Sequence, residues 1–418
     1  MSFSLDDASA TRRFLEFLSI PSVSSQGPSG PYQRAVDFLA HQFGLMGLQT
    51  RTVTSVPGKP ILIVTWPGTS PSLPSILLNS HYDVVPADAA HWSTKPFEPV
   101  MNEAGDIFAR GTQDMKSVCM QYVEAIGRLK ASGATFSRTI HLTFVPDEEV
   151  GGADGLGQFC TSPGFVELNV GVALDEGLAS PTDAFTVFYG ERVPWWVIFR
   201  ATGPTGHGSR FVKNTAMEKL IRVVNKALAF RAEEEGKLHG GCDHGVAKKL
   251  GDVVTLNLTV LKGYVEGING SYAFNVIPTE AHAGFDIRIP PSVSLKDFEA
   301  LLHAWAREDE GITIEWGNSN RLKEHYVTST DGSTNPWWKL FSSTLEGQGL
   351  KLEPEVFPAA TDSRFIRKLG IPCFGFSPMH NTPILLHDNN EFINNGIFLK
   401  GIPIYEKLIA SLANAPEK

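Results

Sequence analysis

Three consecutive carboxylates, Asp147-Glu148-Glu149, stand just after an apolar, β-branched run over 141–145. Such a run predicts a buried strand. Carboxylates this close together raise one another's pKa unless a cation lies between them. An acidic surface turn is the simplest interpretation of this segment taken alone. The alternative is that one carboxylate binds a metal while its neighbour moves protons, which requires further ligands from elsewhere in the chain.

Other residues that can bind metals also stand at the ends of predicted elements. They are His81, Asp83, Asp114, Asp175, Glu176 and His387. The apolar runs 75–80 and 170–174 each lead directly into two of them, and Asp114 stands where a helical pattern begins. A carboxylate at a helix start caps the helix, binds a metal, or does both. Because ligands in α/β sheets gather beyond the carboxyl ends of strands, these positions predict one shared site.

Imidazole and carboxylate without thiolate suit Zn²⁺, Co²⁺ or Mn²⁺ in an open catalytic site. The five predicted ligands are His81, Asp114, Glu149, Glu176 and His387. Five are too many for one tetrahedral zinc that keeps a water, and they fit two metals that share one carboxylate. Asp175 is the alternative to Glu176. The four cysteines are far apart and form no CxxC pair, so we expect reduced thiols and no thiolate-bound zinc.

The elements that must position these ligands fall into two predicted domains, because 418 residues exceed the usual size of a single core. Apolar runs and helical patterns alternate over 1–189 and again over 317–418, which indicates one α/β catalytic domain. Between them, 190–316 reads as half-exposed antiparallel strands with two helices, 216–230 and 294–306. This predicts an inserted α+β domain, and its exposed sheet edge offers a route to a homodimer.

Two further segments carry specific expectations. A long helical stretch is predicted from Glu391 to Leu412, with a kink or break at Pro403. His207 lies in a glycine-rich loop over 203–209, and on its own it reads as a surface residue.

The overall charge limits the class of partner. The net charge of -9 and the pI near 5.8 argue against nucleic acid or an anionic membrane. No run of about 18 apolar residues appears, so no membrane span is expected. The N-terminus lacks a basic segment followed by an apolar one, so we expect no signal peptide and a cytoplasmic protein.

Taken together, the motifs resemble the di-zinc aminoacylase/carboxypeptidase family of metallopeptidases. They are the segments 81–86, 111–116, 146–152 and 175–177, and His387. The segments 185–192, 359–364 and 376–379 are similar to the aminoacylases of that family in particular. The resemblance runs from about residue 10 to the C-terminus. It implies a mixed-sheet, zinc-exopeptidase-like catalytic domain and a homodimer formed through the inserted domain.

The resemblance also implies roles for the metal ligands, with two Zn²⁺ per subunit and Co²⁺ or Mn²⁺ as substitutes. Asp114 would bridge the metals. His81 and Glu176 would complete one metal site, and Glu149 and His387 the other.

Catalytic and substrate-binding roles follow from the same resemblance. Asp83 would orient the ring of His81. Glu148 would be the general base that moves a proton from water to the leaving amine. His207 would enter the partner's active site and stabilise the tetrahedral oxyanion. The predicted contacts for the substrate's carboxylate and carbonyl are Asn275, Arg288 and Arg364.

The implied activity is hydrolysis of N-acyl-L-amino acids, a class of small molecules, to a carboxylate and a free amino acid. A dipeptidase or carboxypeptidase of the same family is the nearest alternative. A catalytically silent metal-binding scaffold is the alternative from a different class, but none of the expected ligands is lost from the sequence.

Overall fold

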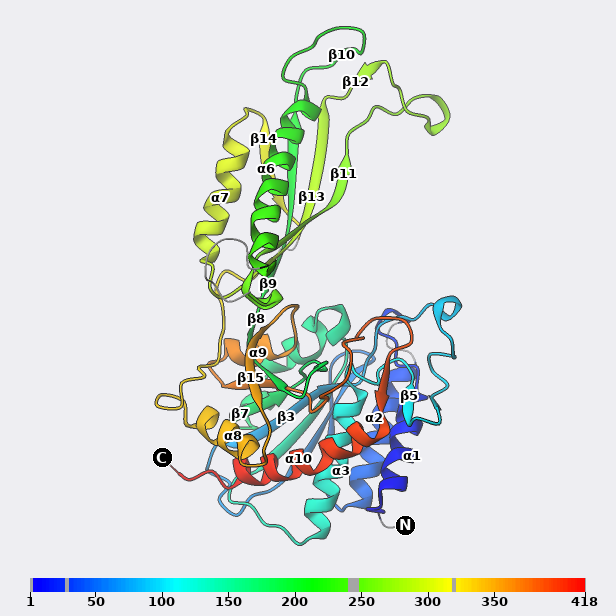
Figure 1. Cartoon of the computed structure of the whole chain (residues 1–418), viewed down its shortest axis with the longest axis vertical. Helices are drawn as coiled ribbons and strands as arrows, with labels where there is room; N and C mark the ends of the chain where they lie inside the picture. The colour runs from blue at the N-terminus through cyan, green and yellow to red at the C-terminus, as the bar shows by residue number, and fades with distance from the viewer. Residues whose placement is uncertain (1–2, 27–29, 240–247, 318–320, 418) are drawn as a thin grey trace. The chain divides into compact units, whose positions relative to one another are not determined.

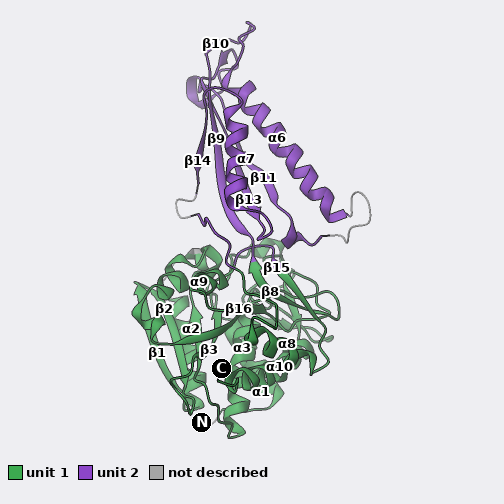
Figure 2. Ribbon diagram, turned by 90° about the vertical axis from the view of Figure 1, so that its left-hand side faces the viewer, with its two compact units in different colours: residues 1–190, 327–355, 361–418 green, residues 191–326, 356–360 purple. Residues whose placement is uncertain are grey.

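The computed structural model describes residues 3–26, 30–239, 248–317 and 321–417, and the chain forms two compact units (Figures 1 and 2). Unit 1 contains Met1–Gly190, Val327–Glu355 and Thr361–Lys418, and unit 2 contains Glu191–Tyr326 and Val356–Ala360. The segments 317–326 and 356–360 therefore differ from the sequence expectation, which placed them in the catalytic domain. The reason is hydrogen bonding to residues far away in sequence: Trp195 Nε1 donates to the carbonyl of Leu322 (2.9 Å), and Arg192 Nε donates to that of Pro358 (2.7 Å).

Unit 1 is built on an eight-stranded mixed sheet with the strand order β1-β2-β6-β3-β7-β16-β8-β15. The strands are β1 Gln49–Val56, β2 Lys59–Trp66, β3 Ser75–His81, β6 Ile140–Val145, β7 Val170–Asp175, β8 Phe185–Glu191, β15 Leu352–Phe357 and β16 Cys373–Phe376. Strand β3 pairs in parallel with both β6 and β7, and β16 pairs in parallel with β7. The carboxyl ends of β6, β3 and β7 therefore lie together at one edge of the sheet, where ligands gather in α/β folds.

Helices cover both faces of this sheet. The first face carries α1 Asp7–Leu18, α2 Pro31–Leu45, α3 Lys116–Ala131, α8 Pro336–Glu346 and α10 Asn395–Ala413; the second carries α4 Gln158–Cys160, α5 Pro163–Val166 and α9 Ser363–Lys368. Along β3, Ile76 and Leu78 join the first core and Leu77 joins the second, as the alternation of side chains in a strand requires. A strand covered on both faces is mostly apolar, which explains the consecutive Ile76, Leu77 and Leu78 on the way to His81.

The C-terminal helix begins later than the sequence predicted. Residues Phe392–Asn394 form a short strand, β17, which pairs with β5 (Asp106–Phe108) in a small sheet that also contains β4 (Val100–Met101). Helix α10 starts only after Asn394, whose side chain caps it by accepting from Gly396 N (2.9 Å). It then runs through Pro403 to Ala413 without a break.

Unit 2 has a four-stranded antiparallel sheet in the order β11-β13-β9-β14. Its elements are β9 Val193–Thr202, β11 Thr255–Lys262, β13 Glu280–Ile289, β14 Ile312–Trp316, α6 Ala216–Gly236 and α7 Leu295–Arg307, with a two-stranded ribbon of β10 Gly206–His207 and β12 Val276–Ile277 (Figure 2). Trp195, Val197 and Phe199 alternate along β9 into the core beneath the two helices. Within the described residues, none of the helices is long and apolar enough to cross a bilayer.

Candidate metal centre

The first histidine of the site is positioned by the sheet. His81 is the last residue of β3 and lies opposite Val145, so the Asp147–Glu149 turn that follows β6 begins beside it. Its ring Nε2 is 3.1 Å from Asp114 Oδ1 and 3.6 Å from Glu176 Oε2. Glu176 directly follows β7, on the other side of β3. The three neighbouring parallel strands thus bring an imidazole and carboxylates to one edge.

Asp114 lies between the two histidines. Its Oδ1 faces His81, and its Oδ2 is 3.1 Å from Nε2 of His387. The same His387 nitrogen is 2.9 Å from Glu149 Oε2. Two triads, His81–Asp114–Glu149 and His81–Glu148–Glu176, each place all their candidate ligand atoms within 4.8 Å of one another. The structure therefore gathers all five predicted ligands, with one oxygen of Asp114 directed to each histidine.

The contacts of Asp175 distinguish it from Glu176. Asp175 Oδ1 accepts from Asn79 Nδ2 (3.1 Å), and Oδ2 accepts from Ser363 Oγ (2.7 Å). Thr143 Oγ1 in turn donates to Asn79 Oδ1 (2.7 Å). Both Asp175 oxygens are thus engaged in a buried network that joins β6, β3, β7 and α9. The geometry favours Glu176 as the ligand.

Asp83 contacts both His81 and the turn that follows β6. The backbone carbonyl of Asp83 lies 2.9 Å from His81 Nδ1, closer than its own carboxylate at 3.6 Å. The carboxylate accepts from the backbone N–H groups of Glu148 (3.2 Å) and Glu149 (3.3 Å). Asp83 therefore orients the ring through its main chain and holds the acidic turn through its side chain.

Burial and mutual repulsion dominate the protonation of the acids. Burial, followed by the charge of Glu176, raises the pKa of Glu148 well above its ordinary value. Burial and the charge of Asp114 raise the pKa of Glu149 to about 7. Burial opposes ionisation of Asp114 as well, but hydrogen bonds from His387 and His81 lower its pKa overall. Hydrogen bonds to Asp114 and Glu149 raise the pKa of His387 to about 10.

The raised pKa values of Glu148, Glu149 and Glu176 mean that these buried acids are ionised together only when positive charge lies between them. A divalent cation supplies that charge, and the donors are imidazole nitrogen and carboxylate oxygen without thiolate, a set that suits Zn²⁺, Co²⁺ or Mn²⁺. Cys119 lies nearby, but its thiol donates to the backbone carbonyl of His81 (3.2 Å) and burial raises its pKa to about 11. The residues present fit a metal centre.

The residues predicted to contact substrate lie in both units. His207, on β10, and Asn275, in the turn just before β12, are both exposed in unit 2. Gly208 N donates to the Asn275 carbonyl (2.8 Å), and His207 Nδ1 lies 2.8 Å from Ser209 Oγ. Arg288, also in unit 2, forms a two-pronged ion pair with Asp286 (2.7 and 3.1 Å).

Arg364 lies in unit 1, at the start of α9. Its Nη1 donates to the carbonyl of Thr361 (2.5 Å) and its Nη2 to that of Gly151 (2.7 Å). Gly151 belongs to the turn that follows Glu148 and Glu149, so this arginine lies close to the acidic turn.

Three supporting residues were not predicted as part of the site: Asn79, Ser363 and Glu391. Asn79 lies two residues before His81 on β3, and a polar residue inside an otherwise apolar run is a signal that could have revealed it. Ser363 is the first residue of α9 and Glu391 lies just before β17, and both are far away in sequence from the segments that they support.

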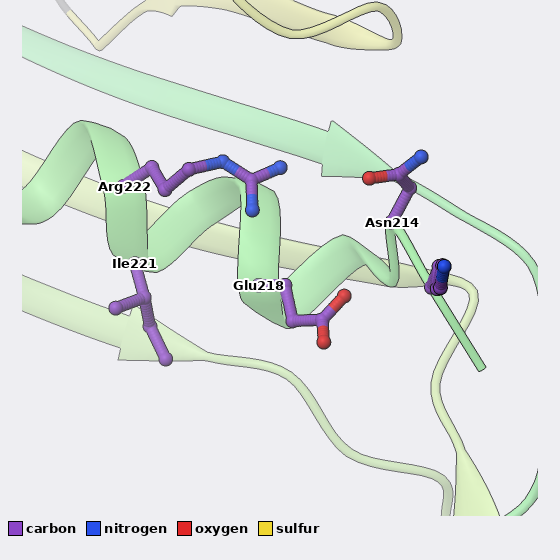
Figure 3. A pocket seen from close by; sticks show the side chains of 5 residues that line it. Asn214, Glu218, Ile221 and Arg222 are labelled. Carbon is purple, nitrogen blue, oxygen red and sulfur yellow. The ribbon is translucent and has the colours of Figure 1, made fainter. Parts of the chain in front are cut away.

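A pocket in unit 2 carries no comparable chemistry. Figure 3 shows it beside the first turns of α6, lined by Lys213, Asn214, Glu218, Ile221 and Arg222. Glu218 is already bonded to Thr215 in the capping box of the helix, and Arg222 is paired with Asp309 (2.6 Å). The candidate metal centre is therefore the cluster of histidines and carboxylates at the edge of the unit 1 sheet.

The fold and this donor set define a metal-dependent hydrolase. The model of the peptidase family M20/M25/M40 matches residues 77–411, and the chain belongs to that family. The predicted family resemblance and mixed-sheet fold are confirmed.

Individual relatives narrow the comparison. The chain is 50% identical over 404 residues to aminoacylase-1 of Mus musculus, covering 96% of this chain and 95% of that one. It is 48% identical over 403 residues to aminoacylase-1 of Dictyostelium discoideum, with coverage of 96% and 97%. The structure of an M20 family metallo-carboxypeptidase from Sulfolobus solfataricus has a TM-score of 0.70 at 19% identity, covering 97% of this chain and 99% of that one. That last likeness concerns the fold alone.

Proposed function

We propose that this chain is an amidohydrolase that cleaves N-acyl-L-amino acids to a carboxylate and a free L-amino acid. The observation that carries the mechanism is Asp114, which directs one carboxylate oxygen to His81 and the other to His387. The near full-length identity to aminoacylases supports the substrate class.

We propose two Zn²⁺ per subunit, with Co²⁺ or Mn²⁺ as substitutes. Asp114 would be shared by the two ions, His81 and Glu176 would hold one of them, and Glu149 and His387 would hold the other. When bound, such ions supply Lewis-acid chemistry by polarising a carbonyl and lowering the pKa of a water. The short contacts among these five side chains support the assignment.

Glu148 is the proposed general base. Its side chain is 8% exposed and makes no hydrogen bond within the described residues, while its backbone N–H is held by Asp83. It takes a proton from the attacking water and passes it to the leaving nitrogen, so that the amino acid departs as an amine. Burial favours the protonated carboxyl that this second transfer requires.

We propose a homodimer in which His207 of one subunit stabilises the oxyanion that forms in its partner's site. Support comes from unit 2 itself, where His207 is exposed on the β10–β12 ribbon. The same part of unit 2 exposes the apolar side chains of Phe211 (105%), Ile268 (85%) and Phe274 (92%). Apolar side chains this exposed commonly mark a surface that another protein covers.

Asn275, Arg288 and Arg364 remain the proposed contacts for the carboxylate and carbonyl of the substrate. Arg364 is the stronger candidate of the two arginines, since it lies beside the acidic turn in unit 1. Both arginines already donate two hydrogen bonds, Arg364 to the carbonyls of Thr361 and Gly151 and Arg288 to the carboxylate of Asp286. A guanidinium recognises a carboxylate best with two parallel hydrogen bonds.

Cytoplasmic location is proposed as well. The buried cysteines Cys119, Cys160 and Cys373 are free thiols, which fits a reducing compartment.

The function is tested by measuring bound metal together with turnover of N-acetyl-methionine, other N-acyl-amino acids and a set of dipeptides. The proposal expects two ions per subunit and the highest kcat/KM for the N-acyl-amino acids. Faster turnover of dipeptides would assign the same centre to a dipeptidase, and no turnover of either class would make the chain a silent scaffold.

A further inference from the structure

We propose that Arg110 and Glu391 form a clip that holds two of the metal ligands, Asp114 and His387, at their working separation. The proposal rests on the two-metal function above and extends it to residues that touch neither metal nor substrate. These are positioning residues: the Arg110 end acts on the ion held by His387, and the Glu391 end acts through Asp114 on both ions.

The Glu391 end holds the segment that carries Asp114. The Glu391 side chain is fully buried, and its Oε1 accepts from the backbone N–H groups of Gln113 (2.6 Å) and Asp114 (3.2 Å). Its Oε2 accepts from Gly111 N (3.1 Å). Hydrogen bonds to an ionised carboxylate are stronger than those between neutral groups. One side chain therefore fixes the backbone on which the bridging carboxylate stands.

The Arg110 end holds the segment that carries His387. Arg110 Nη1 donates to Glu391 Oε2 (2.7 Å) and to the carbonyl of Asp388 (3.2 Å), and Nη2 donates to the carbonyl of His387 (3.2 Å). The guanidinium also lies 5.2 Å from the ring centroid of Trp92, which covers it. Arg110 thus connects two segments that are far apart in sequence.

Both ligands lie outside the regular elements, and Gln113 also joins their segments, since its Oε1 accepts from Leu385 N (2.9 Å) and its Nε2 donates to the Phe392 carbonyl (2.8 Å). His387 stands in a loop, its side chain is 51% exposed, and its backbone φ of 64° is one that residues with a side chain rarely adopt. Asp114 lies just outside α3, whose N-cap is Met115 with no side-chain cap. His81, by contrast, is fixed by the ladder of β3. The ion on the His387 side should therefore depend on the clip more than the ion on the His81 side.

A second buried pair in the same unit provides a matched control. Arg13 and Glu124 join α1 to α3 through two 2.7 Å bonds, and both side chains are buried. Among the described residues, the hydrogen bonds of this pair join Arg13 to Glu124 and to the carbonyl of Ser4, and none reaches a predicted metal ligand. A variant of this pair shows how much the loss of a buried ion pair lowers stability when no metal ligand is involved.

The experiment titrates metal-free protein with Zn²⁺ in competition with a chromophoric chelator, with thermal unfolding as a check of the fold. In Arg110→Met we expect one ion, the one on the His387 side, to lose at least about tenfold in affinity while the other ion is retained. In Glu391→Gln both ions should weaken, because Asp114 serves both. Glu124→Gln should unfold at a lower temperature yet bind two ions as the wild type does.

Arg110→Lys keeps the positive charge and a donor, so it should fold and bind the ion on the His387 side with intermediate affinity. If Arg110→Met does not fold, Arg110→Lys provides the test. Two ions of unchanged affinity in Arg110→Lys and Glu391→Gln would overturn the clip and leave the two-metal function standing. Equal weakening of both ions in the Arg110 variants would also overturn it. A wild-type stoichiometry of one ion would overturn the two-metal function itself, and the clip with it.

Discussion

Glu148 and Glu149 are neighbours in sequence, but their surroundings suit them to different roles, a general base and a metal ligand. Glu149 accepts from Val85 N (3.2 Å) and lies 2.9 Å from His387, so its carboxylate is fixed and paired. Glu148 is buried beside the charge of Glu176 without a hydrogen-bond partner for its side chain within the described residues. A fixed carboxylate suits a ligand, and one with a raised pKa and no fixed partner suits proton transfer.

Glu148→Gln should therefore keep both ions and lose on the order of 10²–10⁴-fold in kcat, the usual contribution of a general base. The amide matches the carboxylate in size but cannot take up a proton. Steady-state kinetics and metal analysis of the same preparation check this. A kcat close to that of the wild type would remove Glu148 from this role.

Metal affinity should rise with pH, because ions and protons compete for the same atoms. The pKa of His387 is raised to about 10, so its ring is protonated at neutral pH and an ion at Nε2 must displace that proton. Burial lowers the pKa of His81, but the charge of Glu176 and a hydrogen bond to Asp114 raise it overall, and burial raises the pKa of Glu176, so ions must displace protons there as well. The pKa of Glu149 is raised to about 7, so one further proton is displaced below that pH. Affinity should gain about tenfold per pH unit for each displaced proton, more steeply below about pH 7 than above it. Chelator competition at several pH values tests this, and a flat profile would contradict it.

At this scale the sequence predicted which residue types meet, because His81, Glu149 and Glu176 end or follow a readable strand and Asp114 stands at the start of a helix. It could not predict which atoms do the orienting. The main-chain carbonyl of Asp83 lies closer to His81 than its carboxylate does. Glu391 reaches Asp114 only because a distant loop folds over it.

At the scale of elements, the strands that end on ligands are also tied together below the site. Thr143 on β6, Asn79 on β3 and Asp175 on β7 form one buried hydrogen-bonded row, and Ser363 of α9 completes it. Buried polar groups of this kind are expensive to leave without partners. The row therefore keeps the carboxyl ends of three strands in register.

Asn79→Ala should lower the stability of the protein by about 1–3 kcal/mol, since it leaves Asp175 and Thr143 each short of one bond in the core. Thermal or urea unfolding of the metal-free protein measures the change. Asn102→Ala is the matched control, because Asn102 donates to Asp106 at the surface (3.1 Å) and should change stability by less than about 0.5 kcal/mol. Equal effects of the two variants would remove the proposed role of the row.

Periodicity located most helices and strands well, and its failures have a common cause. The helical pattern predicted from Glu391 gives way to β17 because Phe392–Asn394 finds a partner in β5, nearly 300 positions earlier along the chain. The residues after β14 join unit 2 through Trp195 and Leu322. In each case a long-range contact overrides a local preference, and a single sequence does not show such contacts.

At the scale of the whole molecule, the proposed function requires two copies of the chain. The metal centre lies entirely in unit 1, and His207 and Asn275 lie in unit 2. The exposed Phe211, Ile268 and Phe274 give unit 2 an apolar surface suited to a partner.

His207→Ala should stay dimeric, and its kcat should fall about 10²–10³-fold, the usual effect of removing one oxyanion donor. Mixing it with Glu148→Gln under conditions that exchange subunits should restore activity, because one site of each mixed dimer then combines an intact Glu148 with an intact His207. Sedimentation and activity before and after exchange check both statements. Mixtures no more active than their parents would contradict action in trans.

The most direct test of the two-metal account is anomalous scattering at the zinc edge from crystals of the metal-loaded enzyme. The account predicts two peaks on either side of Asp114, one contacted by His81 and Glu176 and the other by His387 and Glu149. A single peak, or a second peak bound by other residues, would contradict it.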